Sequence, residues 1–177
     1  MMRPPVILFT YQRADTLRRV LNALRVQSEQ PEQIIVFSDA ARDAKSAQGV
    51  QAVRDLLHSS DDLPLKIIER PENYGGPRNI VTGISTVLAE HPRAVIVEDD
   101  TQPTPHFYAA MCHLLDHYAE HESILSVGAY PSLRHDALPN YTYDVVLSPR
   151  FNAWGWATWS NRWQHVQDRF YPFRNPF

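Results

Sequence analysis

The chain has 177 residues, of which 44% are hydrophobic and 21% charged, a balance that suits one globular domain with a proper core. The net charge of −3 gives no broad basic field for nucleic acid or for an acidic membrane. One cysteine excludes an internal disulfide, and the apolar runs are too short for a signal peptide or a membrane span, so we expect a cytoplasmic protein. No nucleic-acid partner is expected, although peripheral membrane association stays open.

Five short segments rich in β-branched and other apolar residues predict strands. They are residues 6–9, 33–38, 65–69, 94–98 and 124–129. Their starts lie roughly 30 residues apart, which is the length of one strand–helix–strand unit.

Helical patterns fill the gaps between these segments. Asp15 is expected to cap the first helix, whose apolar stripe runs from Leu17 to Leu24. The second helix covers 46–57, the third follows Pro77, which suits the first helical position, and the fourth covers 103–121. This alternation predicts an α/β fold with a mostly parallel central sheet and helices on both faces.

The pattern breaks after residue 130. Residues 131–150 are polar and aperiodic, and Trp154, Trp156 and Trp159 then follow within six positions. These tryptophans either belong to the core or lie in a loop that places an indole against a sugar ring. We predict a single domain, 1–177, with a regular core at 1–130 and an irregular segment at 131–177.

Three consecutive carboxylates, Glu98, Asp99 and Asp100, end the apolar run at 95–97. Adjacent like charges repel and are costly to bury, so a positive charge is expected against them. One interpretation is a divalent metal that bridges to a phosphorylated ligand. The other is a solvated strand end whose acids favour the N-terminus of the next helix.

Polar residues also follow the other expected strands, and ligands of open parallel sheets bind at the carboxyl ends of the strands. Thr10 and Arg13 follow the first strand, Asp39 the second, and a polar segment at 73–78 the third. Together with the acids they suit a nucleotide diphosphate whose phosphates meet arginine and metal. Each also has a simpler explanation, because Asp39 can equally cap a helix and the glycines at 75 and 76 can form a tight turn.

Several other site types lack support. The chain has no G-x-x-x-x-G-K-[ST] and no G-x-G-x-x-G motif, and the loop after the first strand lacks the glycines expected of a nucleotidyltransferase. A phosphorylated receiver domain would need a lysine after a later strand, which is missing. His113, His117 and His121 recur at helical spacing, but no cysteine or acid completes a zinc set, so we expect a solvated helix flank.

Four segments in this order resemble GT-A-fold glycosyltransferases: TYQRADTLRRVL at 10–21, NYGG at 73–76, EDD at 98–100 and NAWGWATW at 152–159. The likeness is to bacterial family 2-like sugar transferases of surface polysaccharide synthesis. These are similar in turn to the N-acetylglucosaminyltransferase that begins complex N-glycan branching. The acidic triplet is a variant of the D-x-D motif of this group.

The resemblance implies a GT-A, Rossmann-like fold and a role for each acid of the triplet. Asp100 would bind Mn²⁺ or Mg²⁺, which bridges the diphosphate of the donor. Asp99 and Glu98 would meet hydroxyl groups of the ribose or of the donor sugar.

The resemblance also implies the other contacts to the donor. Thr10 and Arg13 would line the nucleotide site, Asp39 would read the base, expected to be uracil, and Arg78 would approach the phosphates. Trp156, in a loop at 154–159, would shape the donor-sugar and acceptor side.

The implied activity is metal-dependent, inverting transfer of a sugar from a nucleotide diphosphate sugar, expected to be a UDP-sugar, to a saccharide or lipid-linked acceptor. Such enzymes need a general base downstream of the tryptophan block. Asp168 follows that block without the surrounding motif, so the base stays unknown and 131–177 is expected to be an incomplete acceptor-side segment. The alternative is a truncated, non-catalytic module that binds a sugar nucleotide through 1–130.

Overall fold

The structure is a computed structural model that describes residues 3–130 and 140–170, with the backbone alone at 168–170. Its sheet has six strands in the order β3-β2-β1-β4-β6-β5. The strands are β1 (Val6–Thr10), β2 (Ile34–Ser38), β3 (Leu65–Glu69), β4 (Arg93–Glu98), β5 (Val127–Gly128) and β6 (Trp156–Trp159). The first four are parallel, whereas β6 runs antiparallel to both β4 and β5.

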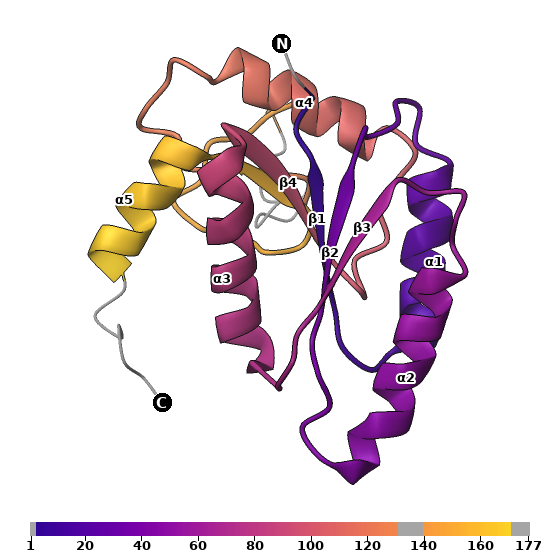
Figure 1. The fold of residues 1–177 in the computed structure, drawn as a ribbon. Coiled ribbons are helices and arrows are strands. Elements are labelled where there is room, and N and C mark those ends of the chain that lie inside the picture. The colour runs from indigo at the N-terminus through magenta and orange to yellow at the C-terminus, as the bar shows by residue number, and fades with distance from the viewer. Residues whose placement is uncertain (1–2, 131–139, 171–177) are drawn as a thin grey trace.

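Helices cover both faces of this sheet, as the sequence predicts. They are α1 (Ala14–Arg25), α2 (Ala44–His58), α3 (Gly75–Glu90), α4 (Phe107–His117) and α5 (Ser160–Phe170). In Figure 1, α1 and α2 lie on one side of the sheet, α3 and α5 lie on the other, and α4 crosses near the amino end of β1. The α/β fold with a mostly parallel sheet is therefore confirmed.

The central strands are buried because each of their two faces meets a helical layer. Val6 and Leu8 of β1 pack in one core cluster with residues of α1, α2 and α4. Ile7 and Phe9, which point to the opposite face, pack in a second cluster with residues of α3. This two-sided burial explains why the strands read as continuous apolar runs.

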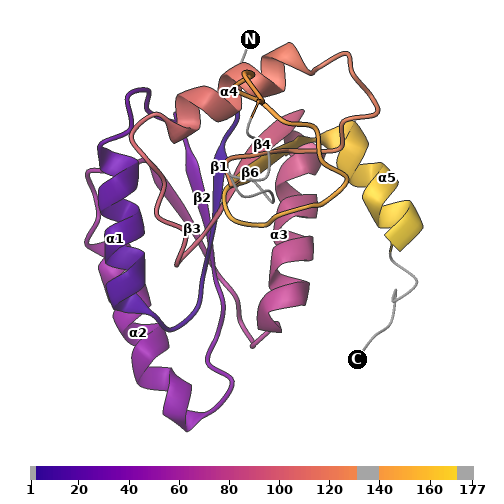
Figure 2. The ribbon, with the colours of Figure 1, turned by 180° about the vertical axis from the view of Figure 1, so that it is seen from behind.

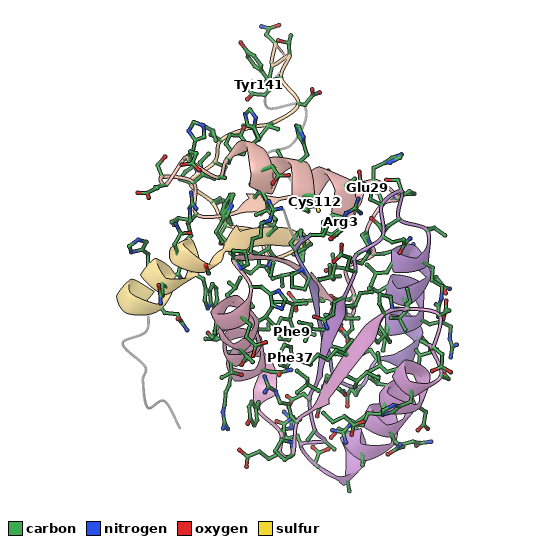
Figure 3. The ribbon with its side chains drawn as sticks, turned by 45° about the horizontal axis from the view of Figure 1, so that its top comes forward. Arg3, Phe9, Glu29, Phe37, Cys112 and Tyr141 are labelled. Carbon is green, nitrogen blue, oxygen red and sulfur yellow. The ribbon has the colours of Figure 1, made fainter. Side chains whose placement is uncertain are left out.

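The second cluster holds α3 close to the sheet at Gly83. The rings of Phe9 and Phe37 stack with centroids 5.6 Å apart (Figure 3). A Cβ atom at Gly83 would lie 2.6 Å from Phe9 Cε1 and 2.9 Å from Phe37 Cδ2. The absence of a side chain at this position therefore lets α3 lie directly over the ends of β1 and β2.

The helix starts differ from the sequence prediction. α2 begins at Ala44 rather than at 46, and α3 begins at Gly75, so Pro77 is its third residue rather than its first. Asp15 does not cap α1, because Arg13 is the N-cap residue and Asp15 lies in the first turn. The fourth helix begins at Phe107 rather than at 103, because a residue before proline disfavours helical backbone and prolines stand at 103 and 105. It ends at His117 and is followed by turns, rather than continuing to 121.

The largest correction lies in the segment predicted to be irregular. Residues 156–159 form β6 beside β4, and α5 follows it directly (Figure 2). The strand expected at 124–129 shrinks to Val127–Gly128 at the edge of the sheet. Trp156 and Trp159 are 7% and 5% exposed, so the core interpretation holds for these two tryptophans, while Trp154 is exposed.

The predictions for residues 131–139 and 171–177 lie outside the described residues. Among the helices of the described residues, none has the length and hydropathy that a membrane span needs.

Candidate functional site

A cavity of about 470 Å³ opens at the carboxyl ends of the parallel strands. Its lining comes from four segments, 9–13, 39–42, 73–80 and 98–99. They are brought together because β2, β1 and β4 are neighbours in the sheet and end in register. A ligand at this edge therefore touches residues that lie almost 90 positions apart in the sequence.

The structure brings most of the predicted site residues to this cavity. Five of them line it: Thr10, Arg13, Asp39, Glu98 and Asp99. Asp100 lies beside it, joined to Arg13 by an ion pair. Arg78 and Trp156 are not among the lining residues.

The ends of β1 and β2 present two buried hydroxyl groups without partners. Thr10 and Ser38 are paired in the register of these strands and are 4% and 0% exposed. Within the described part of the chain, neither Thr10 Oγ1 nor Ser38 Oγ has a hydrogen-bond partner. Buried polar groups are normally satisfied. Thr10 lines the cavity, but its hydroxyl oxygen is itself covered, so a ligand or water would reach it only after a local shift.

Asp39 organises the opposite wall of the cavity. Its Oδ1 accepts hydrogen bonds from the backbone N–H groups of Ala40 (2.9 Å) and Tyr74 (2.8 Å). Its Oδ2 accepts from the N–H of Gly75 (2.9 Å) and from Asn73 Nδ2 (3.3 Å). A carboxylate has about four acceptor positions. The side chain of Asp39 is thus fully used in fixing the loop that leads into α3.

Two acids of the triplet, Asp99 and Asp100, meet one guanidinium group. Arg13 Nη2 donates to Asp99 Oδ1 in a short contact, and Arg13 Nη1 donates to Asp100 Oδ2 at 2.9 Å. The backbone N–H of Tyr11 donates to the other oxygen of Asp99 at 3.3 Å. The side chain of Asp99 is 4% exposed and that of Asp100 is 45% exposed, so one acid is enclosed and the other faces solvent.

The electrostatics of the triplet reflect this crowding. Burial raises the pKa of Glu98, and the neighbouring Asp100 and Asp99 raise it further. Burial likewise raises the pKa of Asp99, against the opposing effect of Arg13. Burial lowers the pKa of Arg13, but Asp99 and Asp100 outweigh it, so the net shift is upward. The prediction that a positive charge lies against these acids is therefore met by a side chain of the protein.

The backbone of the loop that carries Arg13 is held in place by α2 and by the segment just before it. A Cβ atom at Gly49 would lie 2.8 Å from the carbonyl oxygen of Gln12. The Tyr11 hydroxyl accepts a hydrogen bond from the backbone N–H of Arg42 at 3.3 Å. Sequence reasoning did not identify Gly49 or Arg42, because their importance depends on packing between segments distant in the sequence.

Arg78 has other partners. Its guanidinium carbon lies 3.9 Å from the ring centroid of Tyr74, and its Nη1 pairs with Glu72 at 3.2 Å. Asn79, the next residue, is buried at the cavity and accepts a hydrogen bond from Arg70 at 2.9 Å. The sequence prediction did not include Asn79, since it stands inside a helix rather than after a strand.

Trp156 packs in the core cluster between the sheet and α3. It pairs with Ile96 in the register of β6 and β4, and its ring lies edge-on to Phe151 with centroids 4.8 Å apart. It is therefore part of the core behind β4 rather than a wall of the cavity. The side chain of Asp168, on α5, lies outside the described residues.

The described residues fit a metal that is shared with a ligand. No group of three or more His, Cys, Asp or Glu side chains in the described ranges could hold a metal alone. However, Mg²⁺-type ions are commonly bound by one or two carboxylates together with substrate phosphates. Asp100 offers a half-exposed carboxylate for such an arrangement. The three histidines of α4 and its following turn are exposed, as expected for a solvated flank.

Comparison with known proteins relates the chain to one sequence family. The family described as "Glycosyl transferase family 2" matches residues 6–175. No curated protein matches the chain significantly.

Solved structures show the same fold. The mannosyltransferase PcManGT from Pyrobaculum calidifontis, in complex with GDP-Man and Mn²⁺, has a TM-score of 0.60 and 19% identity over 96% of this chain and 46% of that chain. S. aureus TarS 1–349 has a TM-score of 0.56 and 16% identity over 94% of this chain and 49% of that one. Its complex with UDP-GlcNAc has a TM-score of 0.51 and 21% identity over 67% and 32%. The chain thus spans less than half the length of each, and the likeness supports the GT-A, Rossmann-like fold.

Proposed function

The chain belongs to glycosyl transferase family 2, and we propose that it is a metal-dependent glycosyltransferase whose donor is a nucleotide diphosphate sugar, UDP-linked in our expectation. The observation that carries this proposal is one cavity whose lining includes Thr10 at the end of β1 and the carboxylates at the end of β4. A nucleotide needs hydrogen-bonding groups at one end and charge compensation at its diphosphate. Thr10 offers the first, and Arg13, which lines the cavity, would supply the second together with a metal held by Asp100.

The nucleoside lies at the β1–β2 end in this proposal. Thr10 supplies its free hydroxyl, and Asp39 serves the base, expected to be uracil. Because four donors already surround the Asp39 carboxylate, a base that bonds to it shares an oxygen with one of them. S. aureus TarS in complex with UDP-GlcNAc supports a uracil nucleotide in this fold, whereas the mannosyltransferase is in complex with GDP-Man.

The diphosphate lies at the β4 end in this proposal. Asp100 holds Mn²⁺ or Mg²⁺ together with the phosphates, and Glu98 and Asp99 face hydroxyl groups of the ribose or donor sugar. The bound metal would supply a Lewis acid for the departing diphosphate. The complex of the related fold with GDP-Man and Mn²⁺ supports this choice of cofactor.

Arg78 and Trp156 have less direct parts in this proposal. Arg78 reaches the phosphates by leaving Tyr74 and Glu72. Trp156 supports the acceptor side through Phe151. Inversion, the saccharide or lipid-linked acceptor, the likeness to the N-glycan enzyme and the cytoplasmic location stay predictions, and no general base is assigned.

The proposal is tested by titrating UDP into the protein with and without Mn²⁺. We expect Mn²⁺ to raise the affinity for UDP about tenfold or more in the wild type, and the Asp100→Ala variant to lose this gain. Asp62→Ala is a matched control, because Asp62 is also an exposed aspartate paired with an arginine, but at the far end of α1. An affinity for UDP that changes neither with Mn²⁺ nor with the Asp100 substitution would contradict the proposal.

A second assay separates an enzyme from a binding module. Release of UDP from UDP-sugars, with water or added saccharides as acceptors, reports turnover. Metal-dependent UDP binding without any UDP release would favour the alternative, a sugar-nucleotide-binding module.

A further inference from the structure

The ion pair of Arg13 with the acidic triplet has a consequence for the order in which ligands bind. Within residues 3–130 and 140–170, Arg13 is the ion-pair partner of both Asp99 and Asp100. Its two terminal nitrogens bridge the two carboxylates, one nitrogen to each acid. Arg13 therefore provides the positive charge that the triplet requires when no metal is bound.

The two halves of this bridge differ in their surroundings. Asp99 is enclosed and is also bonded by the N–H of Tyr11, so its contact with Arg13 is shielded from solvent. Asp100 is 45% exposed, and Arg13 Nη1 is its hydrogen-bond partner at 2.9 Å. Solvent and ions reach the Asp100 half, so this is the half that can exchange partners.

The backbone beneath Arg13 is held by neighbouring segments, whereas half of its side chain is exposed. The close approach of Gly49 to the Gln12 carbonyl and the bond between Arg42 and Tyr11 hold the loop. The side chain of Arg13 is 51% exposed and lines the nucleotide cavity. A small rotation of the guanidinium can therefore take Nη1 from Asp100 into the cavity, while Nη2 remains on Asp99.

We propose that Arg13 exchanges Asp100 for the nucleotide diphosphate, and that it thereby makes metal binding depend on the nucleotide. This inference rests on the proposed function, in which Asp100 is the metal ligand. In the free protein Arg13 repels a divalent cation and occupies an oxygen of Asp100. A bound diphosphate provides a new acceptor for Nη1, releases Asp100 and compensates the charge of the metal. Arg13 is thus a positioning residue that acts through Asp100.

The experiment measures Mn²⁺ binding by the full chain, by titration with detection of free Mn²⁺ by electron paramagnetic resonance, with and without UDP. In the wild type, UDP should raise the affinity for Mn²⁺. In Arg13→Gln, we expect Mn²⁺ alone to bind about tenfold more tightly than in the wild type, with a smaller gain from UDP. Arg13→Lys, whose single ammonium cannot bridge two carboxylates in this way, should fall between the two.

Arg25→Gln is the matched control. Arg25 lies at the other end of α1 and also forms a two-pronged pair with one aspartate, Asp62. Its substitution removes the same charge at the opposite end of the helix from Arg13, so it should leave Mn²⁺ binding at Asp100 unchanged. If Arg25→Gln tightens Mn²⁺ binding as much as Arg13→Gln does, the effect is one of net charge and the inference is wrong.

The outcomes also separate this inference from the proposed function. If Arg13→Gln and Arg13→Lys bind Mn²⁺ no more tightly than the wild type, while Asp100→Asn abolishes binding, the exchange is wrong and the metal site stands. If Asp100→Asn leaves Mn²⁺ binding intact, the metal assignment itself fails. Should Arg13→Gln not fold, judged by its thermal melt, the result with Arg13→Lys alone decides.

Discussion

The two acidic ends of the cavity are held in opposite ways. At the end of β2, Asp39 accepts four hydrogen bonds, three from backbone N–H groups and one from the Asn73 amide. At the end of β4, Asp100 depends on one arginine side chain that is itself half exposed. Asp39 is therefore held mainly by backbone groups, whereas Asp100 is held by a long side chain that can adopt many rotamers.

This difference indicates that the two ends of the cavity have different roles in ligand binding. A wall made of backbone hydrogen bonds is formed before any ligand arrives, so it gives shape to the nucleoside pocket at no further cost in conformational entropy. A carboxylate held by one exposed side chain can be released when a better partner for that side chain appears. We expect selection of the nucleotide at the β2 end and response to its charge at the β4 end.

The largest expected effect comes from Asp39→Ala. The substitution leaves the partly buried N–H groups of Ala40, Tyr74 and Gly75 without their acceptor. A fully buried donor without a partner costs about 1–3 kcal/mol, and water can satisfy part of this need at a partly buried one. We expect the affinity for UDP to fall by about 100-fold and the free energy of unfolding to fall by roughly 2–4 kcal/mol. Calorimetric titration and thermal melts measure the two effects.

The same variant should leave binding of Mn²⁺ alone unchanged, because Arg13 and Asp100 are untouched. Asp43→Ala is its control, since Asp43 caps α2 outside the cavity and its loss should affect stability without affecting UDP affinity. Normal UDP binding by Asp39→Ala would show that the two ends do not differ in the way described.

A smaller effect is expected from Gly83→Ala. The new methyl group would lie 2.6 Å from Phe9 and 2.9 Å from Phe37, so α3 or the two rings must shift. Overpacking of this kind costs about 1–3 kcal/mol, which a thermal melt detects. Because α3 carries the loop bound by Asp39, UDP affinity should fall more than Mn²⁺ affinity.

Gly76→Ala, in the same helix, is the matched control. Nothing lies within 4 Å of a Cβ atom at this position, and alanine favours helix by up to about 1 kcal/mol. This variant should be as stable as the wild type or slightly more so. A loss of stability equal to that of Gly83→Ala would mean that packing against the phenylalanines is not the cause.

The smallest effect is expected from Glu98→Gln at the β4 end. Burial first, and Asp100 and Asp99 next, raise the pKa of Glu98 above its value in the unfolded chain. The ionised carboxylate therefore opposes folding at neutral pH, and this penalty disappears as the pH falls below the unfolded pKa of about 4.3. Glutamine carries no charge, so the variant should be more stable than the wild type at pH 7.

The size of this gain is limited by the partial exposure of Glu98. An increase in Tm of roughly 2–4 °C at pH 7 corresponds to about 1 kcal/mol for a chain of this length. The gain should shrink as the pH approaches 4. A variant that melts below the wild type at pH 7 would show that Glu98 stabilises the fold through a contact that its charge requires.

Topology explains which parts of the molecule could be predicted from sequence. The apolar runs of β1 and β4 are local signals, and once the sheet is parallel their ends must meet, which brought Thr10, Asp39 and Asp99 to one edge. β6 has no such signal. Its four residues become a strand because β4 offers a free edge, and pairing over that distance in sequence is not visible in the local pattern.

The partners of individual side chains could not be predicted from the sequence either. The sequence predicts a positive charge against the acids but does not identify it as Arg13 rather than a metal, because side-chain rotamers and local neighbours decide which groups meet. Tyr74, four residues before Arg78, provides an aromatic face for that guanidinium. Arg13 is instead placed by its loop against Asp99.

The position of β6 has a consequence for how the molecule is made. β4, which carries the acids, has β1 on one side and β6 on the other, yet β6 comes from a distant part of the chain. During synthesis β1 to β4 can assemble first, but the outer row of N–H and C=O groups on β4 stays uncovered until the ribosome has passed Trp159. A nascent or prematurely ended polypeptide therefore displays an unpaired strand with apolar side chains. It should bind chaperones or aggregate, although the segments that line the nucleotide cavity are already present.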